Sequence, residues 1–401
     1  MGQAVEGAAV IARPRTALIL CLLTAMAEGF DIQSMGVAGP KMIPALHLLK
    51  SQAGWAFSAS LFGLMAGAAV GGWLADRVGR KPVILGSVVV FGLFTLATAM
   101  TGSYAPLLAV RFITGLGLGG ALPMIIAVAS EQPSVKGSSA TVSAITACMP
   151  LGGAIVALFA ASPAASDWRM IFVAGGVSPL LLAVALWRWL PETRAVKAQA
   201  GHEAAVTALF GPGRLGATLC LWVGYAAIAL VLHLFLNWLP QILKSRGFAP
   251  GEALSVAVLF NIGGVIGGIA LGRVIERLGP RWPLAATAAG LVAALLGLAA
   301  GGAALAATAA LAFACGFLIM GVQFGLYGLA PGYYPTPVRG RGVGAAVAAG
   351  RFGSALGPLA AGLLLGAGAS GGQVVAATVP VVLVAGLAAV LLTFMGRPTS
   401  A

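Results

Sequence analysis

Residues 72–81 read Gly-Trp-Leu-Ala-Asp-Arg-Val-Gly-Arg-Lys, and residues 272–281 read Gly-Arg-Val-Ile-Glu-Arg-Leu-Gly-Pro-Arg. A glycine, an acid, an arginine, a second glycine and a terminal base align between the two stretches at an offset of 200 residues. A repeat at so long an offset indicates that the chain is built from two equivalent halves.

The sequence around these two stretches is too apolar for a soluble protein. Of the 401 residues, 60% are hydrophobic and 8% are charged, whereas a soluble domain carries about 25% charged residues. The same values exclude a disordered chain, and the 58 glycines follow no three-residue period that would indicate collagen. What remains is a helical protein that crosses a membrane several times.

Twelve stretches are long enough for spanning helices, which need about 20 mainly apolar residues. They lie at 16–38, 53–75, 82–101, 104–128, 138–162, 169–190, 215–240, 252–274, 283–302, 304–330, 342–367 and 373–395. We predict an all-α membrane protein with an N-terminal six-helix half at 1–190, a central cytoplasmic loop at 191–214 and a C-terminal six-helix half at 215–401. Parallel six-helix repeats predict a pseudo-twofold axis along the membrane normal and a substrate site between the halves.

The net charge of +13 is an orientation signal. Lysine and arginine collect in cytoplasmic loops, and alternating the spans places sixteen of them on the side of the N-terminus and five on the other side. Both termini are therefore predicted to be cytoplasmic, in a bacterial inner (plasma) membrane, and nucleic-acid binding is not needed to explain the charge. Arg13, Arg15 and residues 25–27 also resemble a signal peptide, but cleavage would leave eleven spans, so we expect the first span to be kept.

Each repeated loop follows the second span of its half, and we expect the two loops to act as gates. An acid at the end of one helix can face basic groups and the positive N-terminal end of its neighbour. The candidate gating residues are Gly72, Asp76, Arg77, Gly79, Arg80, Glu276 and Arg277. The alternative is ordinary positive-inside charge at a tight turn, but the match in both halves favours the gate. Pairs such as Gly63/Gly67, Gly115/Gly119 and Gly263/Gly267 predict close helix contacts.

The stretch at 72–81 resembles the signature loop of the major facilitator superfamily, between its second and third spans. Residues 191–194 (Pro-Glu-Thr-Arg) and 111–117 (Arg-Phe-Ile-Thr-Gly-Leu-Gly) resemble two further motifs of that superfamily. The resemblance covers essentially the whole chain and implies the major facilitator fold.

A finer resemblance is to the aromatic acid:proton symporters of that superfamily. Residues 28–31 (Glu-Gly-Phe-Asp) resemble the D-G-[YF]-D motif of that group, with glutamate in place of the first aspartate. Residues 237–240, 334–336 and 350–353 fit the same group. The resemblance implies a monomeric importer that takes up a hydroxybenzoate- or phenylpropanoate-type acid with protons by alternating access, in the lipid bilayer and without a cofactor.

Few ionisable side chains lie inside the predicted spans, and each is a candidate because a charge at the bilayer centre costs about 2.5–3.5 kcal/mol on insertion scales. Glu28 and Asp31 share one helix face, and two carboxylates in low dielectric do not both ionise easily. We expect Asp31 to be the principal proton-coupling residue and Glu28 to assist, although either could be a structural acid. Asp31 and Arg111 both lie about 10 Å below the outer surface, so we expect them to pair when Asp31 is ionised.

Arg351 lies about 14 Å into the eleventh span. A guanidinium suits a carboxylate, so Arg351 is the candidate for binding the substrate's acid group; the alternative is a structural pair. The aromatic ring needs an apolar slot with a few polar contacts. The candidates for that slot are Trp238, Phe324 and Tyr327, with Asn237 and Gln323 as hydrogen-bond partners and Trp55, Phe57 and Tyr225 as further aromatic residues. His233 could relay protons, but we favour a packing role.

Two other function classes compete with import. Residues 150–153 (Pro-Leu-Gly-Gly) partly match a motif of drug:proton antiporters, so export of drugs or other hydrophobic compounds is the alternative. Such an exporter would not need Arg351 for a carboxylate. An enzyme or a receptor is disfavoured, because the sequence shows no Walker loop, no Cys/His metal spacing, no nucleophile set and no large cytoplasmic loop or tail.

Overall fold

The computed structural model describes residues 14–130, 139–190, 209–211, 213–301, 304–335 and 338–395. These ranges contain twelve helices that are long and apolar enough to cross a membrane, which confirms the predicted fold class. The helices are α1 (Pro14–Ala45), α2 (Lys50–Val78), α3 (Arg80–Ala99), α4 (Tyr104–Ser130), α5 (Ser139–Ala161), α6 (Arg169–Trp189), α8 (Leu215–Ser245), α9 (Pro250–Leu278), α10 (Arg281–Ala300), α11 (Leu305–Leu329), α12 (Arg339–Gly366) and α13 (Gly371–Leu392). The predicted central loop lies mostly outside the described residues, so its boundaries stay a prediction.

Two helices continue past a proline beyond the end of the predicted span. The apolar window of the first span ends near residue 38, yet α1 continues through Pro40 and Pro44 to Ala45. Likewise, α8 passes Pro240 and ends at Ser245. Membrane helices tolerate internal proline because neighbouring elements satisfy the freed backbone groups, so an apolar window underestimates their length.

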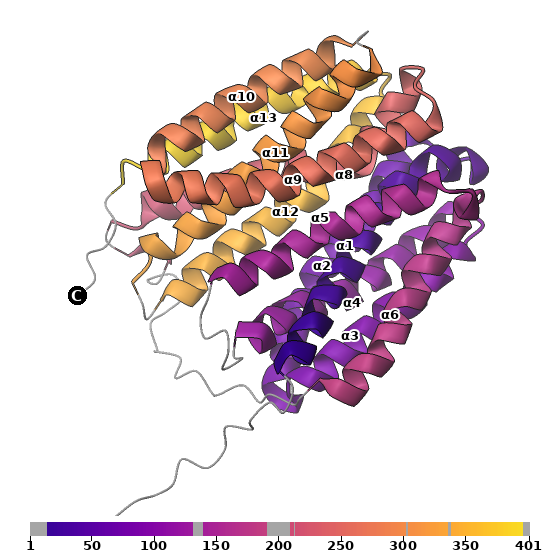
Figure 1. Cartoon of the computed structure of the whole chain (residues 1–401), viewed down its shortest axis with the longest axis horizontal. Helices are drawn as coiled ribbons and strands as arrows, with labels where there is room; N and C mark the ends of the chain where they lie inside the picture. Colours follow the sequence, from indigo (N-terminus) through magenta and orange to yellow (C-terminus); the bar gives the residue numbers. More distant parts are fainter. Residues whose placement is uncertain are drawn as a thin grey trace, which may run out of the picture.

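The two halves have the same internal packing. Helices α1–α6 gather on one side of the molecule and α8–α13 on the other (Figure 1). Helix α2 packs on α4 as α9 packs on α11, α1 on α5 as α8 on α12, and α3 on α6 as α10 on α13. Between the halves α1 meets α8, while α2 meets α12 and α5 meets α9. Because α9 is the counterpart of α2 and α12 is the counterpart of α5, the pairs α2–α12 and α5–α9 are equivalent contacts, as a pseudo-twofold axis requires.

Glycines allow this packing to be close. A Cβ added to Gly63 would meet the Phe112 carbonyl of α4, and one added to Gly115 would meet the Ser60 carbonyl of α2. In the second half a Cβ on Gly263 would meet the Phe313 carbonyl of α11. The predicted small-residue contacts are therefore confirmed, and the backbones of each helix pair approach to within a distance that excludes any side chain.

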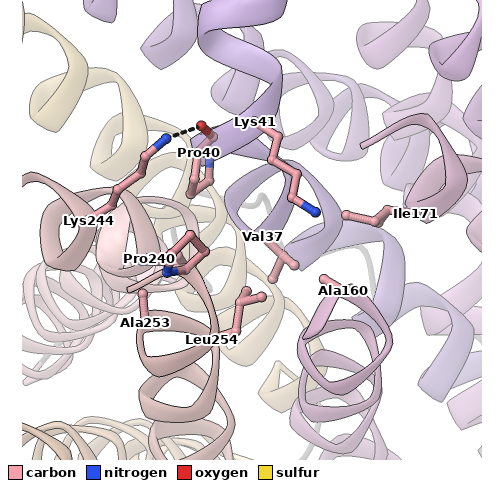
Figure 2. A pocket seen from close by; sticks show the side chains of 10 residues that line it. Val37, Pro40, Lys41, Ala160, Ile171, Pro240, Lys244, Ala253 and Leu254 are labelled. Atoms are coloured by element: carbon pink, nitrogen blue, oxygen red, sulfur yellow. Dashed lines mark hydrogen bonds between the residues drawn. The ribbon is translucent and has the colours of Figure 1, made fainter. Parts of the chain in front are cut away.

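One end of the bundle is sealed by contacts between the halves. It is the end where α1 leads into α2 and α8 into α9, opposite the repeated loops. Lys244 Nζ donates a hydrogen bond to the Pro40 carbonyl at 2.7 Å, and the surrounding space is a cavity of only about 40 Å³ (Figure 2). Deeper in, Gln33 of α1 and Asn261 of α9 exchange two amide hydrogen bonds of 2.9 Å each.

Candidate functional site

A large central space lies between the two halves, where parallel repeats place their sites. It is a cavity of about 390 Å³ lined by α1, α4 and α5 from one half and by α8, α11 and α12 from the other. A second cavity of about 320 Å³ lies between α1, α2, α4 and α12. Leu122, Val347 and Arg351 line both cavities, so the two spaces meet at these side chains.

Helical periodicity brings the cavity residues to one face of each helix. Along α11 the lining residues are Met320, Gln323, Phe324 and Tyr327, and along α12 they are Val343, Val347 and Arg351. Both sets follow the three- and four-residue spacing of a helix face. Of the predicted substrate residues, Arg351, Phe324, Tyr327 and Gln323 are thus brought together, and so is Tyr225 of α8.

Arg351 supplies positive charge to the central cavity. Helix α12 packs close to α8 at Gly353, where the lack of a side chain leaves room for the Ala226 carbonyl; an added Cβ would collide with it. The Arg351 guanidinium has no hydrogen-bond or ion-pair partner among the described residues. Its charge nevertheless lies near enough to act electrostatically on Glu28 and on His233. A half-buried guanidinium without a partner, in a cavity, is suited to hold an anion.

Aromatic rings form the wall beside it. The Tyr327 ring lies 4.9 Å from that of Tyr225 and 6.2 Å from that of Phe324, measured between centroids. Gln323 Nε2 donates to the Tyr327 hydroxyl oxygen at 2.8 Å, while Gln323 Oε1 is buried and has no partner among the described residues. This wall offers flat apolar faces together with one free hydrogen-bond acceptor.

Two predicted substrate residues lie elsewhere. Trp238 Nε1 donates to the Pro358 carbonyl at 2.9 Å, and its ring packs 5.1 Å from that of Phe57. Asn237 turns back to donate to the His233 carbonyl at 2.9 Å, and its backbone abuts Gly36 of α1. Neither residue lines the central cavity, because this part of α8 faces α1, α2 and α12 at the sealed end. The structure therefore does not bring these two residues together with the rest of the predicted ring slot. Trp55, a further candidate, is exposed and stacks on Phe62.

Asp31 and Arg111 form the buried pair that their depths predicted. Arg111 Nη1 and Nη2 donate to the two carboxylate oxygens of Asp31 at 3.1 Å each, and Thr95 Oγ1 donates to Asp31 Oδ1 at 2.7 Å. All three side chains are fully buried. Thr95 carries no sequence signal, since a threonine in an apolar span is usually bonded to its own helix.

Glu28 is in a different environment although it lies one turn before Asp31. It is fully buried, lines the second cavity, and neither of its carboxylate oxygens has a hydrogen-bond partner among the described residues. Arg351 lies on the wall of the same cavity. A buried carboxyl group without partners marks a functional site in a membrane protein more often than a structural one.

The predicted gating residues lie at the end opposite the sealed one. Gly79 and Gly279 have φ of 98° and 75°, which forms the same turn after α2 and after α9. Asp76 and Glu276 are exposed and make no ion pair among the described residues, and the Arg77 guanidinium lies 3.8 Å from the Trp73 ring centroid. Gly72 has open space around it. Among the described residues, Asp76 and Glu276 therefore do not take part in the expected charge-paired clamp in this arrangement, and the gating role of the loops stays a prediction. The motif at 191–194 lies outside the described residues.

Comparison with known proteins places this geometry in a family. The pattern of the Major Facilitator Superfamily matches residues 21–358. The chain is 40% identical to a 3-(3-hydroxy-phenyl)propionate transporter of Escherichia coli (strain K12), over 93% of this chain and 92% of that protein. It is 31% identical to a gallate transporter of Pseudomonas putida, over 88% and 85%. A crystal structure of a bacterial homologue of the human lysosomal transporter Spinster is similar in fold, with a TM-score of 0.77 and 17% identity over 97% of this chain and 99% of that chain.

Proposed function

The chain belongs to the Major Facilitator Superfamily, and from that membership we propose that it imports an aromatic carboxylic acid together with protons by alternating access. The observation that carries the proposal is Arg351, a guanidinium without a protein partner among the described residues, in a cavity between the two halves and beside aromatic rings. Two relatives of the chain are named as a 3-(3-hydroxy-phenyl)propionate transporter and a gallate transporter, and these names support the same substrate class.

The cavity suits such a substrate in size and chemistry. Its volume of about 390 Å³ lies within the range of about 300–1,000 Å³ that small-molecule sites occupy. In our proposal Arg351 donates two parallel hydrogen bonds to the carboxylate. The aromatic ring packs against Tyr327 and Phe324, and Gln323 provides a polar contact.

Proton coupling follows from the two carboxyl groups of α1. While Glu28 is ionised, it attracts Arg351 across the second cavity and competes with the substrate's carboxylate. A proton on Glu28 removes this competition, so the proton and the anion bind together. Protonation of Asp31 would in turn release Arg111, whose described hydrogen bonds all go to that carboxylate. The acid and a single proton together move no net charge across the membrane.

Alternating access then requires the halves to rock about their common axis. With both termini in the cytoplasm, as the loop charges predict, the sealed end faces outward and the repeated loops face inward. Asp76, Arg77, Glu276 and Arg277 would form their clamp when the outer end opens. The protein would act as a monomer in the bacterial inner membrane.

The experiment is uptake of radiolabelled benzoate, 4-hydroxybenzoate, 3-(3-hydroxyphenyl)propionate and a sugar acid into vesicles with an inward-directed proton gradient. We expect uptake of at least one aromatic acid, abolished by a protonophore and by Asp31→Asn, and absent in Arg351→Ala. Lack of uptake of every acid, with extrusion of a lipophilic dye that survives Arg351→Ala, would replace import by the drug-export alternative.

A further inference from the structure

His233 is the polar group of the central cavity that the proposed transport cycle leaves without a role. It lies on α8 about two turns beyond Tyr225, lines the cavity together with Leu232 and Leu236, and is 7% exposed. A buried polar group in an apolar wall is costly unless it has a hydrogen-bond partner. Both nitrogens of its ring therefore need to be accounted for.

The backbone determines where the ring carries its hydrogen. His233 Nδ1 lies 3.0 Å from the carbonyl oxygen of Ala229, one turn earlier in the same helix. Because a carbonyl oxygen can only accept, Nδ1 must be the donor. The ring is buried in a mainly apolar wall that also holds the Arg351 cation, and no carboxylate among the described residues is hydrogen-bonded to it. These surroundings favour the neutral ring, in which Nε2 keeps its lone pair. The one hydrogen bond of the ring among the described residues is the one at Nδ1, so Nε2 has no partner there, and His233 lines the cavity.

The polar groups of the cavity define a complementary ligand. Arg351 can only donate hydrogen bonds, whereas His233 Nε2 and Gln323 Oε1 are acceptors without partners among the described residues. The amide nitrogen and oxygen of Gln33 are both hydrogen-bonded to Asn261. An anion with an unsubstituted ring would satisfy Arg351 and leave both acceptors without a hydrogen-bond partner. An anion whose ring carries a hydroxyl group would satisfy an acceptor as well.

We propose that His233 is a specificity-determining residue whose Nε2 accepts a hydrogen bond from a hydroxyl group on the aromatic ring of the transported acid. This inference rests on the proposed function and narrows its substrates to ring-hydroxylated aromatic carboxylates. A site built to bind a hydroxyl group rejects the analogue that lacks it. When that analogue binds, the acceptor of the site loses its hydrogen bond to water and forms no new hydrogen bond in return.

The test compares acids that differ only at the hydroxyl group. We would measure the KM of proton-driven uptake for 3-phenylpropionate, 3-(3-hydroxyphenyl)propionate and its 3-methoxy analogue, in the wild type, His233→Phe and His233→Gln. In the wild type the hydroxylated acid should have a KM at least about tenfold lower than the other two, since the methoxy group keeps the oxygen and lacks the donor. His233→Phe should bring the three KM values to within about threefold of each other, and His233→Gln, which retains an acceptor, should preserve part of the preference.

The possible failures are distinguishable. If the wild type takes up none of the three acids and neither benzoate nor 4-hydroxybenzoate, the proposed function is wrong. If it takes up benzoate with a KM equal to or lower than that of 4-hydroxybenzoate, the inference about His233 alone is wrong. If the wild type takes up all three with equal KM, the inference about His233 is wrong. This outcome is read from the wild type alone, so it does not depend on whether the variants fold. If the wild-type preference is present but unchanged in His233→Phe, His233 is a packing residue, because a packing defect changes all three KM values in parallel and leaves their ratio.

Discussion

Asp31 and Arg111 show how the geometry of one pair restricts what each residue can be replaced by. The guanidinium reaches both oxygens of the carboxylate at 3.1 Å with the two atoms of one fork. A lysine ammonium is a point charge and cannot make two parallel bonds of this kind. The side chains are fully buried, so an imperfect replacement has no water to complete its hydrogen bonds.

We expect Arg111→Lys to lower proton-driven uptake by at least about tenfold, and Arg111→Ala to destabilise the fold by about 3–5 kcal/mol, because it leaves a buried carboxylate unpaired. Thermal unfolding of the detergent-solubilised protein, read beside vesicle uptake, would measure both. The double variant Asp31→Asn/Arg111→Gln is the matched control and should recover much of the stability but none of the uptake. Full proton coupling in Arg111→Lys would mean that only the charge matters.

The turns before the second helix of each half have the same construction, and in the first half this turn includes a residue with a strained backbone. His47 has φ of 50° and is the single non-glycine residue with positive φ in the described ranges. Its counterpart 200 residues later is Gly247, with φ of 91°. The flanking bonds also match: Gln52 Oε1 accepts from the Leu49 amide at 3.0 Å, and Glu252 Oε2 accepts from the Ala249 amide at 2.8 Å.

Exchanging residues at these two turns should have opposite effects. His47→Gly removes a side chain from a residue whose backbone is in the left-handed region, and should raise the free energy of unfolding by up to about 1 kcal/mol. Gly247→His places a side chain on such a backbone and should lower the free energy of unfolding by about 1–2 kcal/mol. Gly251→Ala is a control, since it places a methyl group in open space within a helix and should be neutral or stabilising. Denaturation of the purified variants side by side would measure the three shifts. A destabilising His47→Gly would show that the imidazole makes a contact that outweighs its backbone strain.

The helices were predictable because hydrocarbon imposes a length and a composition on each of them, and the repeat added independent support. The contacts between helices were less so. Asp31 and Arg111 were found by comparing depths, which works when two rare charges lie at one level. Gln33 and Asn261 are 228 positions apart and carry no local signal for their pairing. Asn237 and Trp238 do not line the central cavity, which periodicity did not reveal because it gives the face of a residue but not the neighbour which that face meets.

The whole molecule follows from duplication of one half. Helices α1 and α8 meet near the pseudo-axis, and α2–α12 and α5–α9 are equivalent contacts on either side of it. Two contacts at the sealed end, the Lys244 bond to Pro40 and the exchange between Gln33 and Asn261, join one half to the other, and so does the packing of α2 on α12. A transport cycle that opens this end must therefore separate α2 from α12, while contacts inside each half persist.

A disulfide across that contact tests the cycle directly. The Cβ of Ser51 on α2 lies 3.4 Å from the position that a Cβ on Gly366 of α12 would take, close to the spacing of about 3.5–4.5 Å that disulfides need. In Ser51→Cys/Gly366→Cys we expect oxidation to lower uptake by at least about tenfold, because the staple holds the two halves together at this end, and we expect reduction to restore it. The control is Gly224→Cys/Ala388→Cys, whose Cβ atoms would be 4.0 Å apart within one half, and which should cross-link without loss of uptake. Uptake that continues after complete Ser51–Gly366 cross-linking would show that α2 and α12 stay together throughout the cycle, and the rocking of the halves would have to be abandoned.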